Sequence, residues 1–214
     1  MTTAITTEKF TSHANTYLLY ILLGLTAGII TRLSDFFEDD SLWSFSSIAT
    51  LFGFWIVTVT LVIYFSHSNR NAAMNVLLYL LSMNLSFYLL KYILGFYVPR
   101  FSNDDFQWNL FMLYNVFAFV CSAISFVLYN WNKKNKWSSF LYALPISGLA
   151  AETIGVGIYL NEHQTFLFQF VFNVIGLLVL GGVFYRHAKN RGIYAVTLLI
   201  VTAIGYFGFY HPFL

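Results

Sequence analysis

Long apolar runs alternate with short polar connectors along this chain, and each run is about the length of a membrane-spanning helix. A helix rises about 1.5 Å per residue, so about 20 apolar residues cross a hydrocarbon core of roughly 30 Å. The runs that reach this length predict spans over residues 17–35, 43–65, 74–95, 108–129, 138–160, 165–185 and 193–211. The pattern therefore predicts an all-α integral membrane protein, a bundle of about seven transmembrane helices.

The two ends of the chain differ in character. Residues 1–16 are polar, and we expect them to form a cytoplasmic segment ahead of a single transmembrane bundle over residues 17–211. The first apolar run lacks a small-residue cleavage site, so we interpret it as a retained span rather than a signal peptide. The last run contains Gly205 and Gly208, and Pro212 follows it. Six spans with a half-inserted final segment is therefore the alternative to seven.

Composition indicates what these runs face. Hydrophobic residues make up 58% of the chain and charged residues only 9%, whereas a soluble domain carries about 25% charged residues. An aromatic content of 21% is the opposite of what disordered chains show. We therefore expect the lipid bilayer as the main partner, and the formal net charge of +2 gives no reason to expect nucleic acid. The one cysteine, Cys121, cannot form an intrachain disulfide.

The placement of charge predicts the orientation. With seven spans and a cytoplasmic N-terminus, eight of the eleven basic residues fall on the inner side. These eight are Lys9, Arg70, Lys133, Lys134, Lys136, Arg186, Lys189 and Arg191. Because Lys and Arg in short loops favour the cytoplasmic side, we expect a multi-pass protein of the cell (plasma or inner) membrane with its C-terminus outside. Trp131 and Trp137 are expected at the inner membrane interface, where indole rings are enriched.

Two sequence offsets suggest an internal repeat. Residues 24–30 (GLTAGII) resemble residues 148–154 (GLAAETI) at an offset of 124, and residues 64–67 match residues 184–187 at an offset of 120. Two parallel three-helix repeats joined by the fourth helix (3+1+3) would result, an architecture that resembles the SWEET sugar carriers and the PnuC vitamin carriers. The Pro-Gln signature of the sugar carriers is absent, because Pro145 is followed by Ile146. Shared Leu- and Phe-rich composition is the alternative explanation of these matches.

Glu152 is the most informative polar residue. An ionisable side chain at the centre of a spanning helix costs about 2.5–3.5 kcal/mol on insertion scales, so it predicts a functional site. Gly148 and Gly155 share its helix face, and Pro145 one turn earlier would free a backbone carbonyl. We expect a broken, glycine-lined helix with an acid at its break, which is suited to binding a cation or a substrate.

Other polar side chains follow single helix faces within the predicted spans. The substrate- or ion-binding candidates are Glu152, Asn84, Tyr88, Lys91, Asn115, Asn173, Gln169 and Arg32. Our hypothesis is an outward-facing central cavity in which Lys91 or Arg32 balances the charge of Glu152. The alternative is structural, because Asn and Gln commonly join spans through interhelical hydrogen bonds. For Asn84, Asn115 and Asn173 we favour the structural interpretation, and for Glu152 the functional one.

Three classes of function remain. A small-solute or ion transporter, or a substrate-binding membrane subunit, ranks first, and a non-catalytic scaffold, chaperone or regulatory subunit is the alternative. Gly24, Ala27 and Gly28 would form the close-packing face toward a partner membrane subunit. A lipid-modifying enzyme ranks last, because the five histidines are scattered and no nucleophile elbow or phosphate loop appears. We therefore expect no catalytic residues, no metal site, no cofactor and no enzymatic activity.

Overall fold

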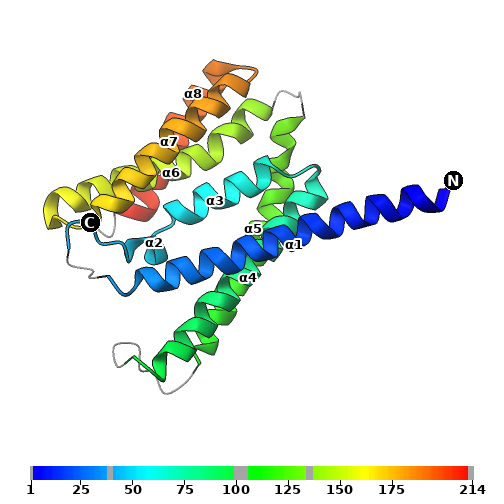
Figure 1. The fold of residues 1–214 in the computed structure, drawn as a ribbon. Helices are drawn as coiled ribbons and strands as arrows, with labels where there is room; N and C mark the ends of the chain where they lie inside the picture. The colour runs from blue at the N-terminus through cyan, green and yellow to red at the C-terminus, as the bar shows by residue number, and fades with distance from the viewer. Residues whose placement is uncertain (1, 38–40, 99–105, 134–136, 212–214) are drawn as a thin grey trace. The chain divides into compact units, whose positions relative to one another are not determined.

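The computed structural model describes residues 2–37, 41–98, 106–133 and 137–211, and within these ranges the chain forms helices and connecting turns but no β-strand. Six helical segments are long and apolar enough to cross a membrane (Figure 1). These segments are Asn15–Ser34, Asn69–Gly95, Trp108–Asn132, Ser138–His163, Leu167–His187 and Arg191–Tyr210. An all-α architecture that fits a multi-pass membrane protein, as the sequence predicts, is therefore confirmed.

The helix bounds extend or divide several predicted elements. The long helices are α1 (Thr2–Ser34), α4 (Asn69–Gly95), α5 (Trp108–Leu128), α6 (Ser138–His163), α7 (Leu167–His187) and α8 (Arg191–Gly205). A 3₁₀ turn, η2 (Tyr129–Asn132), continues α5, and a π-helical turn, η3 (Tyr206–Tyr210), continues α8. Helix α1 includes residues 2–16, which we had expected to precede the first span. The last segment is a full-length apolar helix, so the shortfall from seven lies elsewhere.

The predicted span over residues 43–65 is not one long helix, and the count of seven long helices is not confirmed. The structure has a single turn, α2 (Ser47–Thr50), followed by α3 (Gly53–Tyr64), which is 12 residues long. Leu51 between them is extended, with φ −101° and ψ 154°. The hydroxyl of Ser47 donates to the carbonyl of Ser44 at 2.7 Å, and such local bonds compete with helix formation. Hydropathy gives little warning of this, because Leu51 and Phe52, the residues at the break itself, are apolar.

The break expected near Pro145 is absent, and that prediction is wrong. Helix α6 runs without interruption from Ser138 to His163 with Pro145 inside it. A proline removes one backbone hydrogen bond, but neighbouring helices can hold a membrane helix together around it. Helix α6 packs against α3, α7 and α8 and is the most extensively buried of the long helices. Tertiary packing has therefore overridden the local effect of the proline.

The chain divides into two compact units, which we describe separately. Unit 1 comprises residues 1–33 and 65–127, and unit 2 comprises residues 34–64 and 128–214. Unit 1 thus contains nearly all of α1 together with α4 and almost all of α5. Unit 2 contains α2, α3, α6, α7 and α8.

In unit 1, α1 and α4 approach each other closely through glycine. A methyl group on Gly24 would overlap the backbone carbonyl of Tyr79, and one on Gly28 would overlap that of Met83. The hydroxyls of Ser82 and Ser86 fill the same two places. The contacts advance in the same direction along both helices, so α1 and α4 run parallel. The face that we expected to present to a partner subunit is therefore packed against α4.

Helix α5 runs antiparallel to α4 and is joined to it by polar contacts. The Nδ2 of Asn84 donates to the Oδ1 of Asn115 at 3.1 Å, and the hydroxyl of Ser122 donates to the carbonyl of Ala73 at 2.9 Å. These interhelical bonds fit the structural interpretation of Asn84 and Asn115, which stays a prediction. Because little of α5 is buried, the remaining apolar surface of this helix suits contact with lipid.

In unit 2, α6 lies beside α7, α8 and α3 (Figure 1). The amide of Asn190 donates to the hydroxyl of Ser139 at 2.9 Å, and the hydroxyl of Thr202 donates to the carbonyl of Ser147 at 3.4 Å. Gly205 lies against Ala151 further along. These contacts also advance in one direction, so α6 and α8 run parallel, and α7 returns between them.

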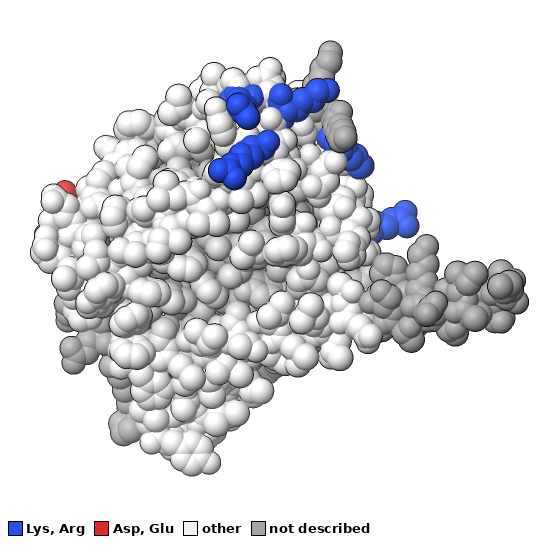
Figure 2. Space-filling model, turned by 45° about the horizontal axis from the view of Figure 1, so that its top comes forward, with Lys and Arg blue, Asp and Glu red and all other residues white. Residues whose placement is uncertain are grey.

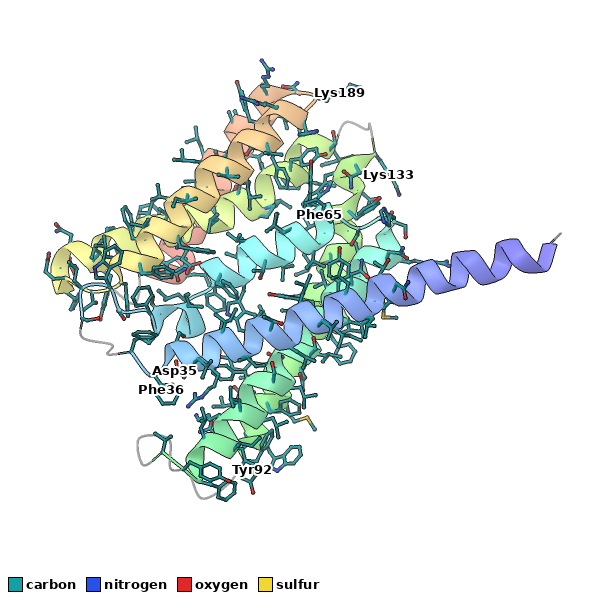
Figure 3. The ribbon with its side chains drawn as sticks, in the orientation of Figure 1. Asp35, Phe36, Phe65, Tyr92, Lys133 and Lys189 are labelled. Carbon is teal, nitrogen blue, oxygen red and sulfur yellow. The ribbon has the colours of Figure 1, made fainter. Side chains whose placement is uncertain are left out.

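Charged side chains mark the two ends of unit 2. Lys133, Arg186, Lys189 and Arg191 are exposed where α6 begins, α7 ends and α8 begins. Figure 2 shows the basic side chains gathered over the α7–α8 turn, and Figure 3 places Lys133 and Lys189 at one end and Asp35 at the other. Glu162 is exposed at the far end of α6. The interior between these ends holds the polar residues described next.

Candidate functional site

Glu152 lies near the middle of α6 and is 0% exposed. The nearest polar groups around its carboxylate are the backbone amides of Phe52 and Gly53 and the side chains of Asn173 and Tyr210. Neither carboxylate oxygen forms a hydrogen bond with good geometry to any of them. An ionisable carboxyl group is therefore buried beside several donors without a fixed partner, in a segment apolar enough to lie within a membrane.

Two amide side chains of α7 complete the surroundings. The Nε2 of Gln169 donates to the Oδ1 of Asn173 at 2.8 Å, and both residues are 0% exposed. The Oε1 of Gln169 and the Nδ2 of Asn173 have no hydrogen-bond partner. A methyl group on Gly53 would overlap Asn173 and lie 2.6 Å from the Nε2 of Gln169. Only glycine therefore lets α3 begin directly against these two amides.

The start of α3 contributes its own electrostatics. The first amides of a helix have no carbonyl partner within the helix and carry a partial positive charge. Phe52, the residue before the helix, has no side-chain oxygen with which to cap them. The carboxyl group of Glu152, which belongs to a different helix, lies at this point. We refer to Phe52, Gly53, Glu152, Gln169, Asn173 and Tyr210 as the Glu152 cluster.

The π-helical turn η3 brings Tyr210 into the cluster. A methyl group on Gly155 would lie 2.8 Å from Cδ1 of Tyr210, so the ring packs onto the glycine one turn beyond Glu152. A π turn changes the angular register of a helix, and such turns are frequent at functional sites. From the sequence we expected Gly155 on the same helix face as Glu152, but not Tyr210 as the residue packed against it.

The remaining candidates belong to unit 1. Arg32 is 3% exposed, and its guanidinium carbon lies 5.4 Å from the ring centroid of Phe87. Tyr88 is buried in edge-on contact with Phe111 at 5.8 Å between ring centroids. The Nζ of Lys91 donates to the Oε1 of Gln107 at 2.6 Å. Lys91 thus has a neutral partner near the end of its own helix.

The structure therefore brings three of the eight predicted residues, Glu152, Gln169 and Asn173, into one cluster. It places Arg32, Asn84, Tyr88, Lys91 and Asn115 in unit 1. An ion pair between Glu152 and Lys91 or Arg32 would connect residues of different units, and this pairing stays a prediction. The start of α3 was missed, and the only sequence signal for it was a glycine within an apolar run.

Within the described residues, no group of three or more His, Cys, Asp or Glu side chains is placed to hold a metal ion. No protein-family model, curated protein or solved structure matched the chain. The proposals below therefore depend on the residues and geometry of this molecule.

Proposed function

We propose that this chain is a membrane transport protein, or the substrate-binding membrane subunit of one, and that it binds a small solute or ion at the Glu152 cluster. The burial of Glu152 without a hydrogen-bond partner carries the proposal. Keeping an ionised carboxylate inside a membrane costs several kcal/mol, roughly 2.5–3.5 on insertion scales, so its retention indicates use. The cluster also lies where a helix is interrupted, and transporters typically bind substrates at such interruptions.

The topology that we propose has seven crossings, a cytoplasmic N-terminus and an external C-terminus in the cell membrane. Parallel packing of α1 and α4 supports it, because a chain that crosses twice in the same direction must return in between. The segment between them contains α3, the short apolar helix. The exposed basic residues at one end of unit 2 support the cytoplasmic assignment of that end.

The 3+1+3 repeat gains support from the same contacts. In both proposed triplets the first helix runs parallel to the third and contacts it, α1 with α4 and α6 with α8. Gly24 lies against Ser82 in the first triplet, and Ser147 accepts a hydrogen bond from Thr202 in the second. Ser82 and Thr202 are separated by the offset of 120 found in the sequence, whereas Gly24 and Ser147 are separated by 123. The first helices of the two triplets would therefore be aligned at an offset of 123, one residue less than the offset of 124 found in the sequence.

A non-catalytic scaffold is the second candidate, and one observation favours it. Helix α3 begins at a residue that cannot cap it, and Glu152 is placed to stabilise that end from α6. If this were its whole role, Glu152 would attach α3 to α6 and bind no solute. Interhelical contacts such as Asn84–Asn115 would then be the general purpose of the buried polar groups.

Thermal unfolding of the purified full-length chain, tested against a library of small solutes and ions, separates the two candidates. A transporter predicts that at least one compound stabilises the wild type and that Glu152→Gln removes this response. A scaffold predicts no response to any compound and a lower stability of Glu152→Gln. Glu162→Gln, an exposed acid on the same helix, is the matched control and should behave as the wild type.

Labelling from each side of a sealed vesicle tests the topology. In a Cys121→Ser background, Glu162→Cys and Lys189→Cys should react from opposite sides, Lys189→Cys from the cytoplasmic side. Reaction of both from one side would contradict the proposed crossing of α6 and α7.

A further inference from the structure

The Glu152 cluster contains buried polar atoms that have no partner, and more of them are acceptors than donors. Three are acceptors: both carboxylate oxygens of Glu152 and the Oε1 of Gln169. One is a donor, the Nδ2 of Asn173. Native proteins leave few buried polar groups unsatisfied, and each one requires an explanation. The amides of Phe52 and Gly53 and the hydroxyl of Tyr210 also face the carboxylate, but the atoms without a partner are mainly acceptors. This excess favours a ligand that offers positive charge or hydrogen-bond donors.

The charge of the cluster points the same way. Among the described residues of unit 2, the basic side chains Lys133, Arg186, Lys189 and Arg191 are all exposed at the end where α6 begins. Glu152 lies 14 residues along α6 from Ser138, which is about 20 Å at the rise of an α-helix. About four helical turns of α6 therefore separate the carboxylate from the end of unit 2 at which these four basic side chains lie.

The number of protein oxygens and the space between them further restrict which ligand can bind. Divalent ions such as Mg²⁺ and Ca²⁺ are typically held by several carboxylates and six or more oxygens. The cluster offers one carboxylate, and the described residues form no multi-acid group. Close contact of Gly53 with Gln169 and Asn173 leaves little room at the start of α3. A single, compact positive charge fits these restrictions.

From the proposed function we infer that the Glu152 cluster binds a small monovalent cation, either an alkali-metal ion or an ammonium group. The carboxylate of Glu152 neutralises the charge, and the Oε1 of Gln169 supplies a neutral oxygen. The hydroxyl of Tyr210 faces the same carboxylate and is a third protein group within reach of the cation. Binding pairs the acceptors that have no partner within the protein.

Thermal unfolding at constant ionic strength tests this inference. The purified full-length chain is measured in choline chloride, which is then replaced stepwise by NaCl, KCl, NH₄Cl or methylammonium chloride. Choline carries the same charge but is bulky and lacks N–H donors. We expect a saturable rise in Tm of about 2–4 °C for at least one compact cation. Preference for Na⁺ or K⁺ identifies an alkali-metal site, and preference for NH₄⁺ or methylammonium identifies an ammonium site.

Variants make the test specific. Glu152→Gln should abolish the rise, Glu162→Gln should keep it, and Gln169→Ala should shift it to several-fold higher cation concentration. If Glu152→Gln does not yield folded protein, Gln169→Ala still decides, because an unchanged midpoint would contradict the site. Equal curves in choline and in every compact cation would overturn the inference.

Thermal unfolding gives different results if only the cation inference is wrong and if the proposed function is also wrong. Stabilisation by a neutral or anionic solute that depends on Glu152, without any cation effect, removes the cation inference and leaves transport in place. The absence of stabilisation by any solute removes both.

Discussion

The two units differ in how far their buried polar side chains are paired. In unit 1, the amides of Asn84 and Asn115 bond to each other across two helices, and Lys91 bonds to Gln107. Asn75 leaves only its Oδ1 without a partner. In unit 2, four atoms of three neighbouring residues, Glu152, Gln169 and Asn173, remain without partners. The amide groups are the same in both units, but their pairing differs.

This difference separates two uses of polarity within a membrane. A bonded pair between helices contributes a modest interaction energy, on average about 0.6 kcal/mol, and requires nothing further. An unpaired buried group carries a desolvation cost of about 1–3 kcal/mol, and more when charged, which a ligand can offset. Our proposal therefore assigns structural packing to unit 1 and ligand binding to unit 2.

The largest effect is expected where unit 1 is packed most closely. Gly28→Val places a branched side chain against the carbonyl of Met83, and such overpacking costs about 1–3 kcal/mol or more. We expect loss of monodisperse protein or a marked fall in Tm, measured by thermal unfolding in detergent. Gly182→Ala is the control, because nothing lies within 4 Å of the added methyl. A tolerated Gly28→Val would show that α1 and α4 do not form this contact.

The next effect concerns the charge in unit 2. Glu152→Gln removes a buried charge that has no hydrogen-bond partner, so we expect the free energy of unfolding without ligand to rise by about 1–3 kcal/mol. Denaturant or thermal unfolding in choline chloride measures it, again with Glu162→Gln as the control. A loss of stability would indicate that the carboxylate mainly stabilises the start of α3.

A smaller effect compares the two amide pairs. A double-mutant cycle on Asn84→Ala and Asn115→Ala should give a coupling energy of about 0.6 kcal/mol, and no more than about 1.7. The corresponding cycle on Gln169→Ala and Asn173→Ala should depend on the cation present, whereas the unit 1 cycle should not. Equal cation dependence of both cycles would abolish the distinction between the units.

The smallest effect is expected at the edge of the cluster. Tyr210→Phe keeps the ring packed on Gly155 but removes the hydroxyl that faces Glu152. Stability should change by no more than about 0.5 kcal/mol, while the cation concentration at half-maximal stabilisation should rise about 2–10-fold. The cation titration described above measures both. A change in stability without a change in the midpoint would assign Tyr210 to packing alone.

The sequence predicted the fold class and most helix positions because hydropathy over a 20-residue window is a strong signal. It failed over residues 43–65 because the turn at Leu51 consists of apolar residues and produces no polar gap. At Pro145 the sequence predicted a helix break that is absent, because packing around α6 overrides the local effect of the proline. Trp131 is 1% exposed and stacked on Tyr142 at 5.4 Å, a contact that the sequence did not predict, and its place at a membrane interface stays a prediction.

The candidate site was predictable only in part. Glu152 was recognisable because a carboxylate within an apolar run is unusual, and the spacing of Gln169 and Asn173 places them on one helix face. The backbone amides at the start of α3 could not be predicted as part of the site, because every residue except proline has such an amide. Tyr210 lies in a π turn. The periodicity of a regular α-helix therefore does not predict that its ring packs on Gly155.

The parallel pairing of α1 with α4 also bears on how the protein is made. Ser82 follows Gly24 by about 60 residues, which at ~5–20 residues per second takes the ribosome about 3–12 s. During that interval the glycine face of α1 is already synthesised, but the helix that covers it is not. Insertion of α1 and its docking on α4 are therefore separate events in time. Errors in the intervening segment would leave α1 in the membrane without its neighbour, open to capture by other helices or to quality control.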